Sequence, residues 1–134
     1  MSNVHNILKL NNQIMQFDNP NKEYEKLKRK ILWTNSNPSQ EMGTGTLINL
    51  SSNDYDELEW IFAYSTTANN AISVNCLKGM NVHVITIGYN SPTLIRRTIS
   101  YVSDTQYSTN VAKFAEADSG SALIPIKVIG IKNS

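Results

Sequence analysis

The sequence predicts an all-β protein, an antiparallel β-sandwich of jelly-roll-like type that follows a short, mainly helical N-terminal arm. Short runs rich in β-branched and aromatic residues are separated by Asn, Ser, Thr and Gly, which is typical of a sandwich or a closed barrel. The last run, residues 123–132, is apolar on both faces, as a buried strand is. No helix-length pattern lies between the runs, which favours antiparallel pairing.

Residues 1–30 differ from the rest and form the predicted arm, and residues 31–134 form the predicted head domain. Apolar residues recur in the arm at spacings of three and four, as in one short coiled-coil seam. This seam consists of Ile7, Leu10, Ile14 and Phe17. A second helical stretch ends near residue 30 and allows Glu25 to pair with Arg29. Helices this short are marginal alone, so the arm folds back on its own head domain or, as we favour, packs against copies of itself or a larger assembly.

Seven strands are predicted in the head domain, with turn residues between them. The alternation is clearest in the second strand, where Leu58, Trp60, Phe62 and Tyr64 are predicted to face the core. Ile61 and Ala63 then point outward, onto a surface suited to a contact between subunits. The predicted strands cover residues 45–50, 58–64, 71–77, 82–88, 94–102, 110–115 and 122–131.

Composition argues against several classes of partner. The formal net charge is +1, so no long-range field attracts nucleic acid or an anionic membrane. The N-terminus has no signal-peptide pattern and no apolar run is long enough to span a bilayer, which predicts synthesis in the cytoplasm without membrane insertion. The single cysteine, Cys76, excludes an intramolecular disulfide, and its alternation with Ile72 and Val74 predicts a buried position.

The residues that catalysis requires are sparse. The two histidines are His5 and His83, and the second is expected to be a solvated or hydrogen-bonded strand residue. The acidic residues between positions 54 and 59 are interpreted as a solvated turn, and neither a calcium loop nor a phosphate-binding glycine loop is present. We therefore predict no catalytic residue, no metal and no cofactor.

Aromatic and basic residues near predicted loops suggest non-catalytic recognition. Tyrosine rings can stack on sugar rings, and polar loops can hydrogen-bond sugar hydroxyls, so a saccharide is the predicted ligand. The predicted ligand-binding residues are Tyr89, Arg96, Arg97, Tyr101 and Tyr107. The alternative is that each tyrosine packs its ring and exposes only its hydroxyl.

Three motifs, at residues 32–38, 52–59 and 124–132, fall in an order that resembles a known β module. They read Leu-Trp-Thr-Asn-Ser-Asn-Pro, Ser-Asn-Asp-Tyr-Asp-Glu-Leu-Glu and Ile-Pro-Ile-Lys-Val-Ile-Gly-Ile-Lys. Residues 31–132 resemble the C-terminal module of tail, baseplate and fibre proteins of bacteriophages and prophages, mostly of Gram-positive hosts. In that module Trp33 and Pro38 lead the chain into the sandwich, and Pro125 sits at a sheet edge or bulge.

The resemblance implies a virion structural protein, often at the tip and often trimeric, without catalytic residues. We expect a homotrimer that attaches to the host surface through a cell-wall saccharide and docks on other virion proteins through its arm. One alternative is a decoration protein of the head, neck or baseplate with a purely structural role and no host ligand. A cell-wall hydrolase is the less favoured alternative.

Overall fold

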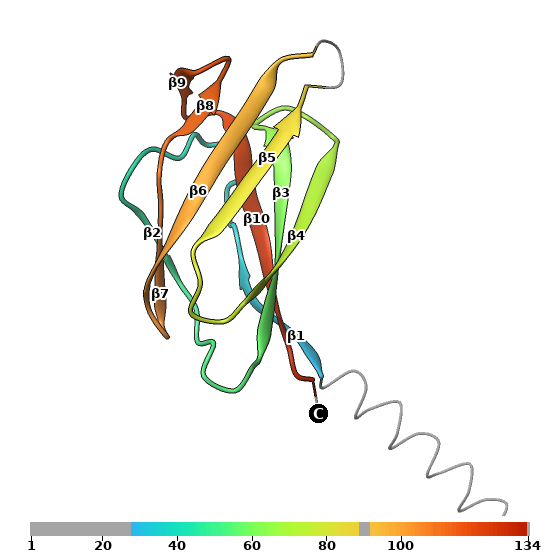
Figure 1. Cartoon of the computed structure of the whole chain (residues 1–134), viewed down its shortest axis with the longest axis vertical. Helices are drawn as coiled ribbons and strands as arrows, with labels where there is room; N and C mark the ends of the chain where they lie inside the picture. Colours follow the sequence, from blue (N-terminus) through green and yellow to red (C-terminus); the bar gives the residue numbers. More distant parts are fainter. Residues whose placement is uncertain (1–27, 89–91, 134) are drawn as a thin grey trace, which may run out of the picture.

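The computed structural model describes residues 28–88 and 92–133, and all strand pairing in them is antiparallel (Figure 1). Sheet A has the order β1-β10-β3-β4, and sheet B has the order β2-β7-β6-β8-β9, with β5 paired to β6. The strands of sheet A are β1 (Arg29–Thr34), β10 (Ala122–Ile131), β3 (Glu57–Ser65) and β4 (Ala71–Leu77). Those of sheet B are β2 (Thr46–Asn49), β7 (Gln106–Thr109), β6 (Leu94–Ser103), β8 (Ala112–Phe114), β9 (Ala117–Ser119) and β5 (Val82–Ile87). The prediction of an all-β, antiparallel fold is confirmed.

Side chains from both sheets meet in one core. On β3, Leu58, Trp60 and Phe62 are buried, as their alternation predicts, whereas Tyr64 is only partly buried. The Trp60 ring meets the Tyr107 ring of sheet B edge to face, with centroids 5.1 Å apart. This geometry suits the quadrupoles of two aromatic rings and links the two sheets directly.

Strand β1 corrects the prediction that the helical arm extends to residue 30. Arg29 and Lys30 belong to this strand, which pairs with β10 through partners such as Arg29 and Ile131. Arg29 donates a hydrogen bond to Glu59 of β3 at 2.5 Å. Glu25, its predicted helical partner, lies outside the described residues. The remainder of the predicted arm, with Ile7, Leu10, Ile14 and Phe17, lies outside the described residues.

Two short strands, β7 and β9, were not predicted, and the predicted strand at 110–115 is shorter. The backbone N–H of Asn110 donates to Thr98, whereas the pairing of β8 with β6 involves Lys113 and Phe114. Asn110 and β8 therefore bond to β6 at different places, and the predicted strand is interrupted between them. No local sequence pattern indicates these hydrogen bonds.

Pro125 lies in β10, between β1 and β3. The register between β10 and β3 shifts between Pro125 and Lys127, so the expected bulge is present but the expected sheet edge is not. Asn35 uses this irregularity: its side-chain N–H donates to the Pro125 carbonyl at 2.9 Å, and its backbone N–H donates to the Ile126 carbonyl at 2.9 Å. Asn35 therefore supplies hydrogen bonds to the two carbonyls at the bulge.

Two further side chains can be compared with expectation. Cys76 is partly buried and packs against the core, and burial raises the pKa of its thiol. The alternation predicts a buried position, and the place of Cys76 on the outermost strand of sheet A explains why it is only partly buried. His83 is exposed, with Nδ1 3.0 Å from the Thr98 hydroxyl, as expected for a hydrogen-bonded strand histidine.

In the described ranges, the chain forms no helix with the length and apolarity needed to cross a bilayer.

The turn between β8 and β9 allows a stability test. Ala115 and Glu116 have φ values of 52° and 66° and connect the paired residues Phe114 and Ala117. Such a two-residue turn favours Asn or Gly, because a Cβ is strained at positive φ. We expect Ala115→Asn to raise the free energy of unfolding by about 0.5–1 kcal/mol, measured by urea denaturation. The control Ala117→Asn, at a strand position, should give no gain, and an equal gain would show that turn geometry is not the cause.

Candidate functional site

The structure separates the residues predicted to bind a ligand. Arg97 is 2% exposed and Tyr107 is fully buried, so both belong to the interior and neither can contact a saccharide at the surface. This corrects the prediction for these two residues. The Tyr107 ring packs on Trp60, and burial raises the pKa of Tyr107.

Arg97 acts as a structural clasp in the interior. Its Nε and Nη2 donate to the Ala122 carbonyl at 3.2 and 2.8 Å, and Nη2 also donates to the Gly120 carbonyl at 3.3 Å. Nη1 donates to the carbonyls of Asn110 at 2.6 Å and Met42 at 3.2 Å. These five bonds match the five N–H donors of a guanidinium. Burial lowers the pKa of Arg97 to about 10, so the group is still cationic at neutral pH.

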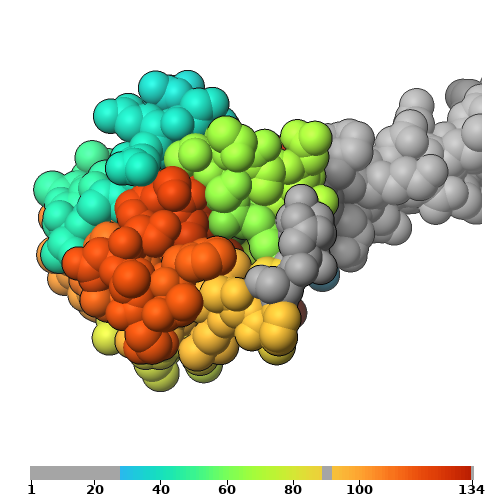
Figure 2. All heavy atoms as spheres, turned by 90° about the horizontal axis from the view of Figure 1, so that it is seen from above, coloured from blue at the N-terminus to red at the C-terminus, as the bar shows by residue number. Residues whose placement is uncertain are grey.

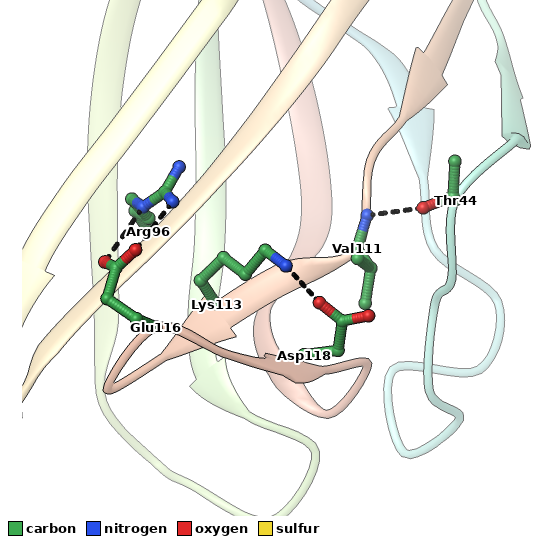
Figure 3. A network of polar contacts seen from close by, with 6 residues as sticks. All are labelled: Thr44, Arg96, Val111, Lys113, Glu116 and Asp118. Carbon is green, nitrogen blue, oxygen red and sulfur yellow. Dashed lines mark hydrogen bonds and ion pairs between the residues drawn. The ribbon is translucent and has the colours of Figure 1, made fainter.

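Arg96 and Tyr101, two further predicted ligand residues, lie five positions apart on β6 and contact different residues. Tyr101 is partly buried, its ring centroid lies 5.5 Å from that of Tyr107, and its hydroxyl donates to Asp104 at 2.8 Å, which raises the pKa of Tyr101. Arg96 points away from the core and donates to both carboxylate oxygens of Glu116, at 3.2 and 2.9 Å (Figure 3). Tyr89 lies outside the described residues. The predicted ligand residues that are described do not form one site.

Ile61 and Ala63 are partly buried on β3, opposite Lys127 and Ile124 of β10. Ile124 is fully buried although it does not belong to the main core cluster. The predicted subunit contact through Ile61 and Ala63 stays a prediction.

A hollow that the sequence did not predict lies where β1 begins. We call it the basal hollow; its volume is about 310 Å³ and its lining residues are Lys30, Ile31, Leu32, Ser51, Asp54 and Tyr55. Two of its walls are the start of β1 and the loop between β2 and β3, at the end of the molecule where the C-terminus also lies (Figure 1). The hollow therefore joins two separate segments of the sequence, residues 30–32 and residues 51–55.

The loop that carries Tyr55 is fixed by hydrogen bonds. The N–H and the hydroxyl of Ser52 both donate to the Asp104 carbonyl, at 2.9 and 3.0 Å, and the Tyr55 N–H donates back to Ser52 at 3.1 Å. The Asp56 N–H donates to the Ile131 carbonyl of β10 at 2.9 Å. Because one end of the loop is tied to the turn between β6 and β7 and the other end to β10, Tyr55 has a defined position before any ligand binds.

The Tyr55 ring packs closely on β10. A Cβ added at Gly130 would lie 2.6 Å from Cγ of Tyr55, closer than such atoms approach in proteins, so the ring occupies the space that the glycine leaves. The ammonium of Lys132 lies 5.7 Å from the ring centroid, within cation–π range. Glycine at position 130 is therefore required for Tyr55 to take its place in the wall of the basal hollow.

The polar groups of the basal hollow are available for a ligand. Within the described ranges, the Lys30 ammonium, the Ser51 hydroxyl, the Asp54 carboxylate and the Tyr55 hydroxyl make no hydrogen bond or ion pair. A cation, an anion and two hydroxyls beside an aromatic ring can donate to and accept from several hydroxyls at once. This arrangement suits a polyhydroxylated ligand such as a saccharide. The predicted turn Ser52-Asn53-Asp54-Tyr55-Asp56 contains two of the lining residues, Asp54 and Tyr55, but its composition indicates only a solvated turn.

A second, smaller hollow lies at the opposite end, near the connection between β1 and β2. We call it the loop hollow; its volume is about 160 Å³ and its lining residues are Asn35, Asn37, Gln40, Glu41, Met42 and Thr46. Most of its amides are already engaged, since Asn35 bonds Pro125 and the Asn37 N–H, and Gln40 lies 3.5 Å from the Asn37 amide. The loop hollow is therefore a weaker candidate for a ligand site than the basal hollow.

Among the described residues, no cluster of three or more His, Cys, Asp or Glu side chains could hold a metal ion. Comparison of the chain with protein-family models, with curated proteins and with solved structures found no match.

Proposed function

We propose that this chain is a non-catalytic structural protein of a bacteriophage particle, a tail, baseplate or fibre component that binds a host cell-surface saccharide. The observation that carries the ligand class is the basal hollow, with its fixed aromatic ring and its polar groups that have no partner among the described residues. The particle is suggested by the three motifs that resemble phage modules. The second of these motifs contains Asp54 and Tyr55, so the resemblance and the hollow meet at the same loop.

The proposal includes the fold class and the partners. Two sheets across one core are compatible with a jelly-roll-like sandwich, the class expected for such a head domain. The N-terminal arm would dock on other virion proteins or on its copies in a homotrimer, made in the host cytoplasm and carried in the virion. Several copies on one particle would turn weak saccharide contacts into firm attachment.

A binding assay with an array of bacterial cell-wall glycans tests the ligand. We expect Asp54→Ala to weaken binding of the captured glycan about 10-fold, because a hydrogen bond to a charged group is lost. Glu41→Ala removes a carboxylate from the loop hollow and should leave the affinity unchanged. Equal losses in both variants, or a larger loss in Glu41→Ala, would move the ligand away from the basal hollow.

The alternative is a decoration protein with a structural role and no host ligand. It is favoured by the exposed aliphatic side chains of β5 and β6, which suit a protein partner better than a sugar. A blank glycan array, together with capture of a virion protein by the full chain, would support this alternative against saccharide attachment.

A further inference from the structure

We infer that the basal hollow selects a sugar that carries an N-acetyl group over the same sugar with a hydroxyl group in its place. This selectivity rests on the saccharide binding proposed above and specifies the class of sugar. The lining of the hollow divides into two parts. The apolar part contains Leu32 and the Tyr55 ring, and the polar part contains Lys30, Ser51 and Asp54.

The apolar part is continuous, because Leu32 and the Tyr55 ring are neighbours. A Cβ added at Gly130 would lie 2.6 Å from Cγ of Tyr55 and 2.8 Å from Cδ1 of Leu32, so the ring and the leucine methyl group flank the same point. Leu32 is partly buried and packs against the core, which holds its side chain in place. A sugar ring stacked on Tyr55 therefore has an apolar surface beside it, where a hydroxyl group would lose water without gaining a partner.

The polar part comes from both walls of the hollow. Lys30 belongs to β1, whereas Ser51 and Asp54 belong to the loop between β2 and β3. In the part of the chain that the structure describes, no hydrogen bond or ion pair engages these three side chains. Lys30 and Asp54 bring one charge of each sign, so the lining itself favours a neutral sugar over a charged one.

An acetamido group has a complement for each part of this lining. Its N–H donates to a carboxylate such as that of Asp54, and its carbonyl oxygen accepts from an ammonium or a hydroxyl, which Lys30 and Ser51 supply. Its methyl group packs against an apolar side chain, which is Leu32 here. The volume of about 310 Å³ lies near the lower limit for ligand sites and suits one substituted sugar ring.

The opposite end of the molecule provides a control position. Figure 2 looks onto this end, where the β8–β9 hairpin and the start of β6 lie side by side. Leu94, the first residue of β6, is 42% exposed and pairs with Ile87 of β5. The basal hollow lies at the other end, beside the start of β1. A substitution of Leu94 therefore changes a leucine that is remote from the hollow.

Matched glycans on the cell-wall glycan array test the selectivity with the full chain. Each glycan is presented in two forms, one with an acetamido group and the other with a hydroxyl group at the same carbon. We expect the captured glycan to bind about 10-fold more tightly in its acetamido form, because the methyl group gains an apolar contact and the amide gains hydrogen-bond partners. Uronic acids on the same array test recognition of a negative charge by Lys30 and Lys132.

Leu32→Asn should lower the preference for the acetamido form to less than about 3-fold, because asparagine has a similar size but a polar end. Leu94→Asn is the matched control and should keep the preference of the wild type. Thermal unfolding checks that both variants are folded. The comparison of the two glycan forms on the wild type needs no variant, so it decides the question even if Leu32→Asn is unfolded.

The outcomes separate this selectivity from saccharide binding itself. Equal affinities for the two forms, a preference for the hydroxyl form or for a uronic acid, or equal losses of preference in Leu32→Asn and Leu94→Asn would overturn the selectivity alone. In those cases Asp54→Ala would still weaken binding if the saccharide lies in the basal hollow. A blank array would overturn both proposals.

Discussion

Arg97→Met is expected to lower the free energy of unfolding by about 3–5 kcal/mol, a large part of the stability of a domain this size. Methionine fills much of the same volume but has no donor. The carbonyls of Ala122, Gly120, Asn110 and Met42 would lose their shared partner, and each buried acceptor left unpaired costs about 1–3 kcal/mol. Part of this loss is recovered where water reaches the less buried carbonyls.

Urea denaturation of the wild type, Arg97→Met, Arg97→Lys and Arg96→Met measures the effect. Lysine has three donors at one point and cannot reach the five positions of the fork, so Arg97→Lys should also be strongly destabilised. Arg96→Met is the matched control, because its guanidinium is exposed and its ion pair with Glu116 is screened by water. If the two arginine-to-methionine variants had similar stability, the clasp would not be a determinant of the fold.

Gly130→Ala is expected to lower the free energy of unfolding by about 2 kcal/mol. The new Cβ would lie 2.6 and 2.7 Å from Cγ and Cδ1 of Tyr55 and 2.8 Å from Cδ1 of Leu32. Relief requires movement of the ring base, not of a flexible chain end, so the strain is of the overpacking kind. Because Tyr55 also lines the basal hollow, the same substitution should weaken glycan binding.

A double-mutant cycle identifies the cause. In a Tyr55→Ala background the clash with the ring disappears and only the close approach to Cδ1 of Leu32 remains, so Gly130→Ala should then cost about 1 kcal/mol less than in the wild type. Gly43→Ala is the control, since no atom lies within 4 Å of its added Cβ, and it should be close to neutral. An unchanged cost in the Tyr55→Ala background would show that the close approach of Gly130 to Tyr55 is not the source of the loss.

The predictions that the structure confirms depend on local periodicity. Leu58, Trp60 and Phe62 face the core because successive side chains of a strand point to opposite faces. In a half-buried strand this alternation is visible in the sequence. Pro125 was expected at an irregular position because it has no N–H for a ladder. Such features need no knowledge of distant residues.

The predictions that were wrong depend on distant partners. Arg97 follows an exposed arginine and suggested a surface position, but the carbonyls that accept its hydrogen bonds belong to residues up to 55 positions away. The start of β1 matched a helical spacing, and its pairing with β10 at the far end of the chain overrode that preference. Tyr55 was concealed in a turn motif, because its role depends on Gly130.

Alternation and turn residues act between near neighbours, so the all-β class, the antiparallel pairing and the apolar residues of the central strand can be predicted from the chain alone. Which polar groups are buried, which segments form the basal hollow and which aliphatic side chains remain exposed follow from the packing of distant segments. The physical reason is that hydrogen-bond satisfaction and burial are properties of the assembled chain. The sequence around an arginine or an isoleucine is the same whether distant segments cover the side chain or leave it in water.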